Sequence, residues 1–286
     1  MPELPEVEIV KRALQNKIID EVIETVEILR EQSIGFPEVN KFSSRLKGLT
    51  FSAISRRGKY LILHLKDNRK NKSSMLVVHL RMSGRLLLLD KTKLAKKKPK
   101  FLRVKITMQS GQLLIFEDMR VFGRLYYVLS LSELERVVPS FGSLGIEPLE
   151  KIKAEQLTEC LSKRRQAIKT ALLDQSLIAG IGNIYADEIL FETGIHPLTK
   201  ASSITSEQIK LLTSTIPKVL EQAINHGGSS IKDFVDSDGV NGNYQHKALV
   251  YGRDGKPCHR CRSIIERIKI SGRSAHFCSL CQNYCP

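Results

Sequence analysis

Two Cys-x-x-Cys pairs near the C-terminal end constrain the fold of this chain more than any other feature. Cys258 and Cys261 form the first pair, Cys278 and Cys281 form the second, and sixteen residues separate the pairs. This spacing is typical of zinc-binding cysteines. Four thiolates complete a tetrahedral shell and leave no position for water or substrate. The sequence therefore predicts one structural Zn²⁺ and no role for this metal in catalysis.

The residues between the two pairs favour a β-hairpin. Residues 263–270 and 274–277 alternate in polarity as strands do, and Ser271-Gly272-Arg273 has the composition of a turn. The metal is therefore expected to anchor a hairpin with Arg273 at its tip. A guanidinium there can reach a phosphate, although an arginine in a turn is often only solvated.

The charge of the chain points to a polyanionic partner. Among its 286 residues, 45 Lys and Arg exceed 30 Asp and Glu, which gives a net charge of +15. Nucleic acid is the leading candidate for such a partner. The apolar segments are shorter than the roughly 20 residues of a membrane span, and the acidic start does not resemble a signal peptide. We therefore expect a cytosolic protein without membrane association, in a reducing compartment where cysteine pairs favour metal over disulfides.

The first residues, Met1-Pro2-Glu3-Leu4-Pro5-Glu6, contain a candidate nucleophile. Removal of Met1 would leave Pro2 with a free secondary amine. An α-amine titrates at about 7.7–8.0, so a useful fraction is unprotonated at neutral pH. Attack of this amine on an aldehyde-like carbon would give a Schiff base, with Glu3 beside it as acid or base.

The same residues also fit an ordinary helix start. Pro5 suits the first helical turn, and Glu6 and Glu8 suit the positive end of the helix dipole. An apolar stripe with helical spacing follows, formed by Leu4, Val7, Val10 and Leu14. The sequence predicts a helix here, and evidence for chemistry at Pro2 has to come from the rest of the chain.

Short apolar segments separated by turns fill the next hundred residues. Several of them alternate or are continuously apolar, as in a two-layer sheet, and few helices are expected. The candidate strands are residues 21–29, 49–55, 60–65, 75–80, 85–89, 101–108, 112–116 and 124–129. These segments predict an N-terminal β-sandwich. The basic residues 91–100 between two strands are interpreted as a solvated loop.

A change in apolar period, from two to about 3.6, marks a second, helical domain beyond Pro148. Small residues and glycine at 139–145 indicate a linker before it. Helices are expected near residues 154–161, 166–173, 183–192 and 206–226, and Gly227-Gly228 ends the last one. A polar loop bearing glycine follows from about residue 229 to 243.

A glycine turn, Gly180-Ile-Gly182-Asn183, opens the third of these helices. Free backbone amides at a helix start suit a phosphate, although most such turns only connect two elements. The basic residues of the preceding segment favour a clamp on a nucleic-acid backbone; they are Lys163, Arg164, Arg165 and Lys169.

Six motifs, in this order, resemble the bacterial formamidopyrimidine-DNA glycosylase family, which repairs oxidised purines. They are Pro2-Glu-Leu-Pro-Glu-Val-Glu8, Arg57-Gly-Lys-Tyr-Leu61, His79-Leu-Arg-Met-Ser-Gly84, Glu117-Asp-Met-Arg-Val-Phe-Gly123, the turn at Gly180–Glu188 and the cysteine hairpin. The resemblance spans the whole chain.

The resemblance implies an α+β multidomain fold. An N-terminal two-layer β-sandwich with an N-terminal helix would precede a helix-two-turn-helix domain that carries a β-hairpin zinc finger. The expected parts are a catalytic sandwich domain at 1–135, a linker at 136–150, the helix-two-turn-helix at 151–228, a lesion-recognition loop at 229–245 and the zinc finger at 246–286.

The resemblance also implies an activity and its residues. A monomer in the bacterial cytosol, associated with the nucleoid through damaged double-stranded DNA, would excise 8-oxoguanine and formamidopyrimidines and then cut the strand by β,δ-elimination. Pro2 would attack C1′ of a flipped-out nucleotide, Glu3 would donate protons in base excision and ring opening, and Glu6 would support them. Lys59 matches the proton donor of the β-elimination, and Arg273 matches that of the δ step.

Further residues match DNA contacts of the family. Met82, Arg120 and Phe122 match an intercalating set, in which an apolar pair fills the emptied stack and the arginine pairs with the orphaned cytosine. Met82 and Phe122 would lie in the core under a purely structural interpretation, but adjacent turn residues favour loops. The remaining expected contacts are His79, a basic residue beside a sheet edge, and Arg164, Lys169 and Asn183 on the DNA backbone.

The chain departs from the family pattern at three positions. Phe101 follows Lys100 where the family commonly has a DNA-contacting histidine, so that contact is missing or moved. Val121 replaces a frequent basic residue between Arg120 and Phe122, and Cys285 adds a thiol near the finger. None of these changes touches the expected nucleophile.

Three alternatives stay open. An endonuclease VIII-like enzyme for oxidised pyrimidines would use the same Pro2-Glu3 pair, although Leu4-Pro5 and the intercalating set argue against it. A noncatalytic zinc-finger DNA-binding or architectural protein would explain the charge and the zinc, but it would not need Pro2. A structure-specific RNA binder leaves both Pro2-Glu3 and Lys59 unexplained.

Overall fold

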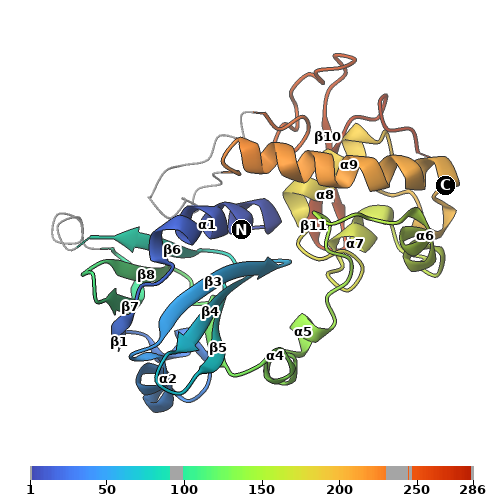
Figure 1. Cartoon of the computed structure of the whole chain (residues 1–286). Helices are drawn as coiled ribbons and strands as arrows, with labels where there is room; N and C mark the ends of the chain where they lie inside the picture. Colours follow the sequence, from blue (N-terminus) through green and yellow to red (C-terminus); the bar gives the residue numbers. More distant parts are fainter. Residues whose placement is uncertain (1, 91–98, 230–243, 245–246, 285–286) are drawn as a thin grey trace. The chain divides into compact units, whose positions relative to one another are not determined.

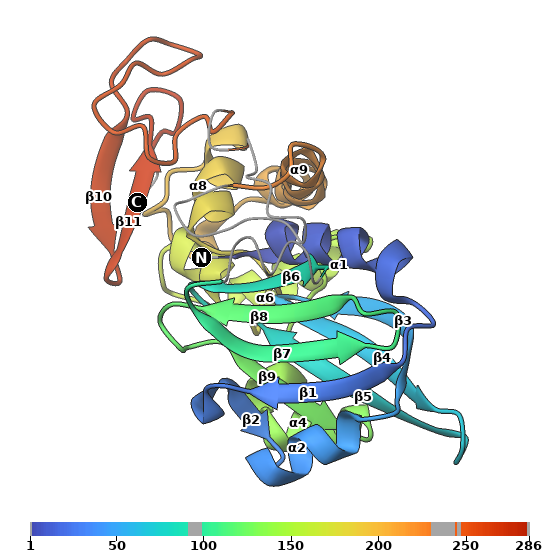
Figure 2. The same ribbon diagram turned by 90° about the vertical axis from the view of Figure 1, so that its left-hand side faces the viewer.

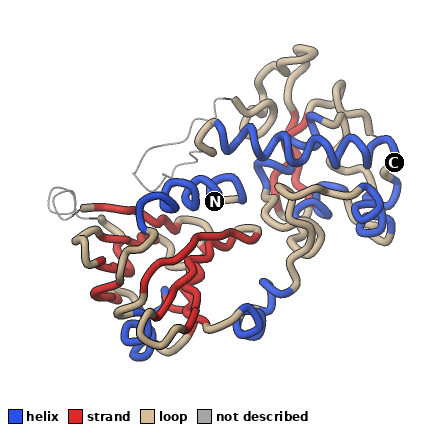
Figure 3. Tube along the Cα trace, viewed as in Figure 1, coloured by secondary structure: helices blue, strands red, loops and turns tan. Residues whose placement is uncertain are grey.

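The chain forms two compact units. The computed structural model describes residues 2–90, 99–229, 244 and 247–284. The N-terminal unit comprises Met1–Gly142 with Gly227–Asn243, and the C-terminal unit comprises Ser143–His226 with Tyr244–Pro286. Strands dominate the first and helices the second (Figures 1 and 3). The predicted α+β class, with a sandwich followed by a helical part and a β-hairpin, is confirmed.

Two sheets face each other in the N-terminal unit (Figure 2). One sheet has the strand order β1-β7-β8-β6 and the other has the order β2-β9-β5-β4-β3. The strands are β1 Ile23–Ile28, β2 Ile34–Phe36, β3 Thr50–Arg57, β4 Tyr60–Asp67, β5 Lys72–His79, β6 Gly84–Leu89, β7 Leu102–Met108, β8 Leu113–Asp118 and β9 Arg124–Val128. All strand pairs are antiparallel except the short parallel pair of β2 with β9.

Alternation along the strands builds the core. In β8, Leu114 and Phe116 join the main cluster between the sheets, whereas Leu113 and Ile115 join a smaller cluster that also contains Leu87. Successive side chains of a strand point to opposite faces, so a continuously apolar strand can supply both clusters.

Two helices close the open sides of the sandwich. The edge strands on one side are β3 and β6, and α1 (Leu4–Ile18) lies beside both of them (Figures 1 and 2). The edge strands on the other side are β1 and β2, and α2 (Val39–Leu46) packs against that pair. The predicted apolar stripe of α1 is confirmed, because all four of its members are fully buried.

The eight predicted strands are all present, but one short strand and three short α-helices were missed. α2 buries only Phe42 and Leu46, and β2 has three residues, so neither gives a clear periodic pattern. Part of the expected linker at 136–150 is helical: it contains the end of α4 (Leu131–Val137) and all of α5 (Pro139–Gly142). Pro139 suits a helix start, and Phe141 packs edge-to-face on Tyr60 with ring centroids 5.3 Å apart.

The C-terminal unit is built around one buried helix. Its elements are α6 Ala154–Ser162, α7 Ile168–Leu173, α8 Asn183–Glu192, the short 3-10 turn Ala201–Ser203, α9 Ser206–Asn225 and the antiparallel hairpin β10 Glu266–Ile270 with β11 Arg273–Phe277. Another short 3-10 turn, Glu31–Ser33, lies in the N-terminal unit. Every residue of α8 from Ile184 to Phe191 is buried. A helix that is buried all round lies at the centre of its domain, and α7, α9 and β11 accordingly pack against it. The expected stop after α9 is confirmed, since Gly227 and Gly228 adopt φ of +77° and +73°.

We predict that Leu63→Ala in β4 lowers the free energy of unfolding by about 2–5 kcal/mol, because the fully buried side chain would leave a cavity. Leu29, at 56% exposed, provides a matched control, and Leu29→Ala should change stability by no more than about 0.5 kcal/mol. Urea unfolding followed by circular dichroism suits a chain without tryptophan. Equal effects of the two substitutions would contradict the described core.

Candidate functional site

The expected site residues fall into two groups, one in each unit. The N-terminal unit carries Pro2, Glu3, Glu6, Lys59, His79, Met82, Arg120 and Phe122, and the C-terminal unit carries Arg164, Lys169, Asn183, Arg273 and the four cysteines of the two pairs.

The first turn of α1 gathers one proline and two buried carboxylates. Pro2 is buried and directly precedes Glu3, which is the N-cap residue and forms a capping box with Glu6. Glu6 Oε2 accepts a hydrogen bond from the Glu3 N–H at 2.8 Å, and Glu6 Oε1 accepts one from the Ser229 N–H at 2.8 Å. Glu6 therefore fixes the backbone beside Pro2 and also fastens the residue at which the expected lesion-recognition loop begins.

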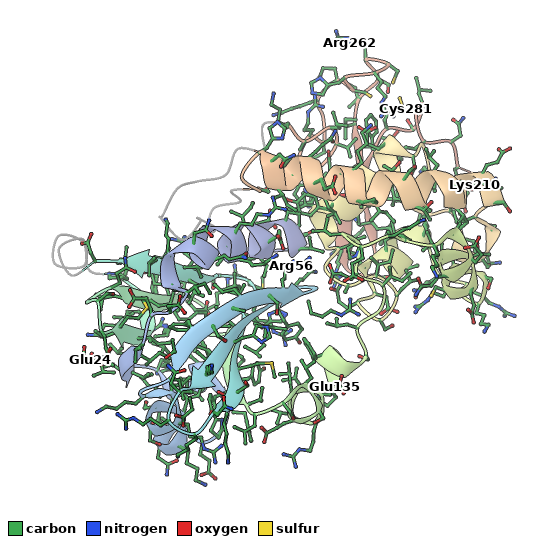
Figure 4. The ribbon with its side chains drawn as sticks, viewed as in Figure 1. Glu24, Arg56, Glu135, Lys210, Arg262 and Cys281 are labelled. Carbon is green, nitrogen blue, oxygen red and sulfur yellow. The ribbon has the colours of Figure 1, made fainter. Side chains whose placement is uncertain are left out.

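Lys59 lies in the two-residue turn between β3 and β4 and is 9% exposed. Gly58 precedes it with φ of +54°, a conformation that glycine adopts without strain. Arg56 supports the turn, since its guanidinium donates to the Gly58 carbonyl at 2.9 Å and to Glu8 Oε2 of α1 at 2.9 Å. In Figure 4 Arg56 lies between α1 and the end of β3. The Arg56–Glu8 pair thus ties the turn that carries Lys59 to the helix that follows Pro2.

Glu8 is ionised in this arrangement. Burial would raise the pKa of its carboxyl, but hydrogen bonds from Arg56, Lys11 and Arg12 outweigh that effect and hold the pKa below its ordinary value. A buried carboxylate with several charged donors is well satisfied. The pair therefore stabilises the fold at neutral pH, and its contribution is lost only as the pH falls through the lowered pKa.

His79, at the end of β5, is buried and neutral. It pairs across the sheet with Tyr60 and lies edge-to-face on that ring, with centroids 4.4 Å apart. Burial first, and then the charges of Arg81 and Lys59, lower the pKa of His79 to about 3. Its Nδ1 accepts the Arg81 N–H at 3.1 Å, which assigns the proton of the neutral ring to Nε2. His79 can therefore donate one hydrogen bond from Nε2, but it offers no charge at neutral pH.

The three residues of the expected intercalating set lie on two adjacent loops. Met82 is 39% exposed and Phe122 is 52% exposed, and Arg120 is exposed as well, with Nη1 at 3.5 Å from Met82 Sδ. Their expected position on loops rather than in the core is confirmed.

A buried charge network surrounds Lys169, one of the expected DNA-contacting residues of the C-terminal unit. Lys169 is fully buried, and its ammonium donates to Asp187 at 2.6 Å and to the Ser274 carbonyl of β11. Asp187 also accepts the backbone N–H and Nδ1 of His276, each at 3.0 Å. The side chain of Lys169 therefore joins α7, α8 and the hairpin. A lysine is stable in such a position only when it is paired, which explains the buried aspartate.

The other three basic or amide residues of this unit are differently placed. Arg164 is half-buried and pairs with Asp174. Asn183, the first residue of α8, donates from Nδ2 to the Ser274 carbonyl at 3.0 Å. Arg273 is exposed, as expected, but it is the first residue of β11 and pairs with Ile270, so the turn itself is Ser271-Gly272, with φ of +48° and +80°. Two successive positive φ values suit a tight hairpin turn.

The four cysteines fit a zinc ion. Within the described residues they form the single cluster of metal-binding side chains, with ligand atoms all within 4.8 Å of one another. Ideal tetrahedral coordination at about 2.3 Å separates the sulfurs by about 3.8 Å, and Cys258 and Cys281 are 3.9 Å apart. Figure 4 marks Cys281. The donor set is complete with four thiolates, so the site holds one structural Zn²⁺.

The sequence pattern did not reveal several residues that hold these groups in place. They are Glu8 and Arg56, Asp187 with His276, and Glu188, whose carboxylate accepts the backbone N–H groups of Leu249, Val250 and Tyr251. Asp187 and Glu188 are two acidic residues inside an otherwise apolar helix, and this unusual placement was the available signal. The basic loop at 91–98, most of the expected lesion-recognition loop and Cys285 lie outside the described residues. None of the described helices is long and apolar enough to cross a bilayer.

A β-sandwich that begins with a buried Pro-Glu turn, together with a helical unit that carries a four-cysteine hairpin, defines a zinc-finger DNA glycosylase. Family models match three consecutive parts of the chain. Residues 1–125 match the formamidopyrimidine-DNA glycosylase N-terminal domain, residues 144–235 match its H2TH domain, and residues 255–283 match the zinc finger found in FPG and IleRS. The chain belongs to the formamidopyrimidine-DNA glycosylase family.

Relatives agree over the full length. Proteins named formamidopyrimidine-DNA glycosylase are 43% identical in Prochlorococcus marinus (strain NATL1A), covering 99% of this chain and 100% of the relative, and 44% identical in Gloeobacter violaceus, covering 99% and 98%. A point mutant of the Lactococcus lactis Fpg, solved with DNA containing Fapy-dG, superposes with a TM-score of 0.88 at 34% identity and covers 99% of this chain and 100% of its own. The Lactococcus lactis Fpg bound to DNA with an abasic site gives the same score, identity and coverage.

We predict a pH-dependent contribution of His79 to stability. An unfolded histidine titrates near 6.5, whereas the folded ring binds a proton only near pH 3, so the unfolded chain binds the extra proton between these values. Lowering the pH from 7 to 5 should therefore cost the wild-type protein about 2 kcal/mol more than His79→Asn, whose side-chain oxygen can still accept the Arg81 N–H. Urea titrations at both pH values measure the difference. An identical pH dependence in the two proteins would contradict a neutral His79.

We predict that Cys278→Ala releases the zinc and unfolds the hairpin, because a structural zinc site contributes its binding energy to folding. Metal analysis should show the loss, limited proteolysis should show new cleavage within residues 247–284, and binding to DNA should weaken. Cys160→Ala is the matched control, since Cys160 lies in α6 outside the cluster. If residues 247–284 stayed resistant to proteolysis after verified zinc loss, the metal would not anchor the hairpin.

Proposed function

We propose that this chain is a bifunctional DNA glycosylase and AP lyase that removes oxidised purines, 8-oxoguanine and formamidopyrimidines, from double-stranded DNA. It would act as a monomer in the cytoplasm, in contact with the nucleoid through DNA. The observation that carries the proposal is the first turn of α1, where Pro2 is followed by two buried glutamates whose positions are fixed by hydrogen bonds. Full-length similarity to named glycosylases supports the same activity.

The proposed reaction begins at Pro2 after removal of Met1. The amine attacks C1′ of the everted nucleotide, the C1′–N bond to the damaged base breaks, and the sugar ring opens to give an iminium. Glu3 protonates the departing base, takes up the proton that the Pro2 nitrogen loses, and passes it to the ring oxygen as the ring opens. Glu6 holds the backbone of Glu3. Loss of a C2′ proton then breaks the bond to the 3′ phosphate, and a second elimination releases the 5′ phosphate. Water hydrolyses the imine and frees Pro2.

Lys59 and Arg273 are the proposed proton donors of the two eliminations, by their match to the family motifs. Lys59 is positioned by the Arg56–Glu8 pair, and Arg273 is exposed beside the hairpin turn. Both would also neutralise phosphates, so their substitution would weaken binding as well as chemistry.

The DNA contacts are proposed in the same way. Met82, Arg120 and Phe122 form the wedge, and His79 donates to a phosphate as a neutral ring. Asn183 and Arg164 are proposed backbone contacts. Lys169 is a third proposed backbone contact, and its ammonium is positioned by Asp187 and the hairpin backbone.

The runner-up substrate is an oxidised pyrimidine. A structure of the wild-type Lactococcus lactis Fpg with DNA containing an oxidised pyrimidine has a TM-score of 0.87 and 34% identity to this chain. The experiment therefore compares both lesion classes. A noncatalytic DNA-binding protein is the second alternative, and it would bind both duplexes without reacting.

We predict that borohydride traps this protein on a duplex with one 8-oxoguanine opposite cytosine, and that peptide mapping finds the adduct on the peptide beginning at Pro2. A Schiff base is reducible, whereas a noncovalent complex is not. Pro5→Ala provides a control within the same helical turn and should retain the crosslink, because Pro5 has no free amine. Tight binding without any crosslink would favour the binding protein, and trapping only on oxidised-pyrimidine DNA would favour the runner-up.

We predict that Glu3→Gln lowers base excision by at least about a hundredfold, the typical contribution of a positioned acid, while lesion DNA still binds. The glutamine oxygen can still accept the N–H of Glu6, so the start of α1 should persist. Glu24→Gln, at an exposed position of β1 that Figure 4 labels, is the matched control. Single-turnover excision and fluorescence anisotropy separate the two properties, and unchanged excision would refute the acid role of Glu3.

A further inference from the structure

Asp118, at the end of β8, is completely buried. Its carboxylate contacts two loops: the first is residues 80–83, between β5 and β6, and the second is residues 119–123, between β8 and β9. Burial of a carboxylate is costly unless hydrogen bonds replace its hydration. The Asp118 carboxylate accepts hydrogen bonds from neutral groups of the two loops, and these bonds form a connected set.

The first loop is joined to the carboxylate through a hydroxyl. The Ser83 Oγ donates a hydrogen bond to Asp118 Oδ1. The same Ser83 oxygen accepts the backbone N–H of Arg120 at 3.1 Å, so it also contacts the second loop directly.

The second loop is held at two points, one on either side of Val121 and Phe122. The Arg120 N–H approaches Asp118 Oδ1 at 3.1 Å, and the Gly123 N–H donates to Asp118 Oδ2 at 2.7 Å. Both carboxylate oxygens are therefore occupied as acceptors. An asparagine has only one acceptor oxygen, and its amide would direct N–H groups at one of these donors.

The loop between these two points is strained. Val121 adopts φ of +57°, a left-handed conformation that a β-branched residue rarely adopts. Such a conformation persists only where the surroundings enforce it. Gly123 leaves no room for adjustment, since a Cβ there would lie 2.6 Å from the Phe116 ring and 3.1 Å from Asp118 Oδ2.

The exposed side chains of the expected intercalating set lie at or next to the residues that bind Asp118. Met82 directly precedes Ser83, Arg120 bonds through its own backbone N–H, and Phe122 lies between the strained Val121 and the anchored Gly123. A fixed backbone beneath three exposed side chains restricts where they can point before any ligand arrives. This lowers the entropy that is lost when the side chains insert into a stack of bases.

We infer that Asp118 and Ser83 form a positioning pair that holds Met82, Arg120 and Phe122 as one preformed wedge. The pair sets the rate at which the lesion leaves the base stack and the discrimination of the opposite base. This inference rests on the proposed glycosylase function and extends it to residues that contact neither the damaged base nor the reacting atoms.

The test uses the full-length protein and compares Ser83→Ala and Asp118→Asn with the wild type. We expect single-turnover excision of 8-oxoguanine opposite cytosine to slow by roughly ten- to a hundredfold, as for a misplaced positioning group, and the preference for cytosine over adenine as the opposite base to shrink. A 2-aminopurine beside the lesion should report slower unstacking. Borohydride crosslinking to an abasic duplex should stay near the wild-type level, because that substrate has no base to displace.

Two further variants sharpen the test. Leu113→Ala removes a side chain at the other end of β8, in the smaller apolar cluster with Leu87 and Ile115. It should keep both the unstacking rate and the opposite-base preference even when the protein is destabilised. The double variant Ser83→Ala/Asp118→Asn should lose less than the product of the two single losses, because the two side chains act through one hydrogen-bonded set.

Wild-type unstacking and opposite-base preference in folded Ser83→Ala would overturn the inference, even if Asp118→Asn proved too unstable to assay. Equal effects of Leu113→Ala and Ser83→Ala would also overturn it, since general destabilisation would then be the cause. Absence of both excision and crosslinking in the wild-type protein would overturn the proposed function itself. That outcome is recognisable because it does not depend on any variant.

Discussion

Burial of the apolar stripe of α1 against the open side of the sandwich is the interaction on which the N-terminal unit depends. Without α1, the edges of β3 and β6 and the core between them would face solvent. The same burial places the first turn of the helix, with Pro2, Glu3 and Glu6, at a defined position on the unit. A candidate nucleophile near the end of a chain would otherwise be among its most mobile parts. Here the hydrophobic core holds it, and the capping box orients the carboxylates beside it.

Charged groups then connect this helix to the rest of the N-terminal unit. Glu8 lies beyond the capping box and binds Arg56, which in turn supports the turn of Lys59. The C-terminal unit uses the same device in Lys169, Asp187 and His276, which join two helices to the hairpin. In both cases a buried ion pair costs desolvation energy and stabilises one specific arrangement. Each candidate proton donor is close in sequence to one of these pairs. Lys59 lies in a turn three residues after Arg56, and Arg273 follows the hairpin turn three residues before His276.

Much of this architecture could be predicted from the sequence. Short alternating or continuously apolar segments between turns identified eight strands, glycine marked the end of α9, and cysteine spacing identified the zinc site. α2 and β2 were missed because α2 buries only two residues and β2 is only three residues long, so neither gives a clear periodic pattern. Arg273 was placed one residue too far into the turn. Lys169 shows a deeper limit. A lysine in a basic segment looks like a surface residue, and only the tertiary contact with Asp187, eighteen residues away, reveals that it is buried. Sequence motifs supplied the candidate catalytic and DNA-binding residues, but they did not identify the residues that hold these candidates in place.

The network of Lys169, Asp187 and His276 makes the stability of the helical unit depend on the zinc ion, although none of these three residues is a zinc ligand. His276 and Ser274 belong to the strand that runs directly into the ligand Cys278. When the metal leaves, the partners of a buried ammonium and a buried carboxylate leave with it, and water must enter the centre of the helical unit to solvate them. In a cell short of zinc, this protein would therefore be lost by degradation as well as by inactivation, and its abundance would follow the supply of the metal.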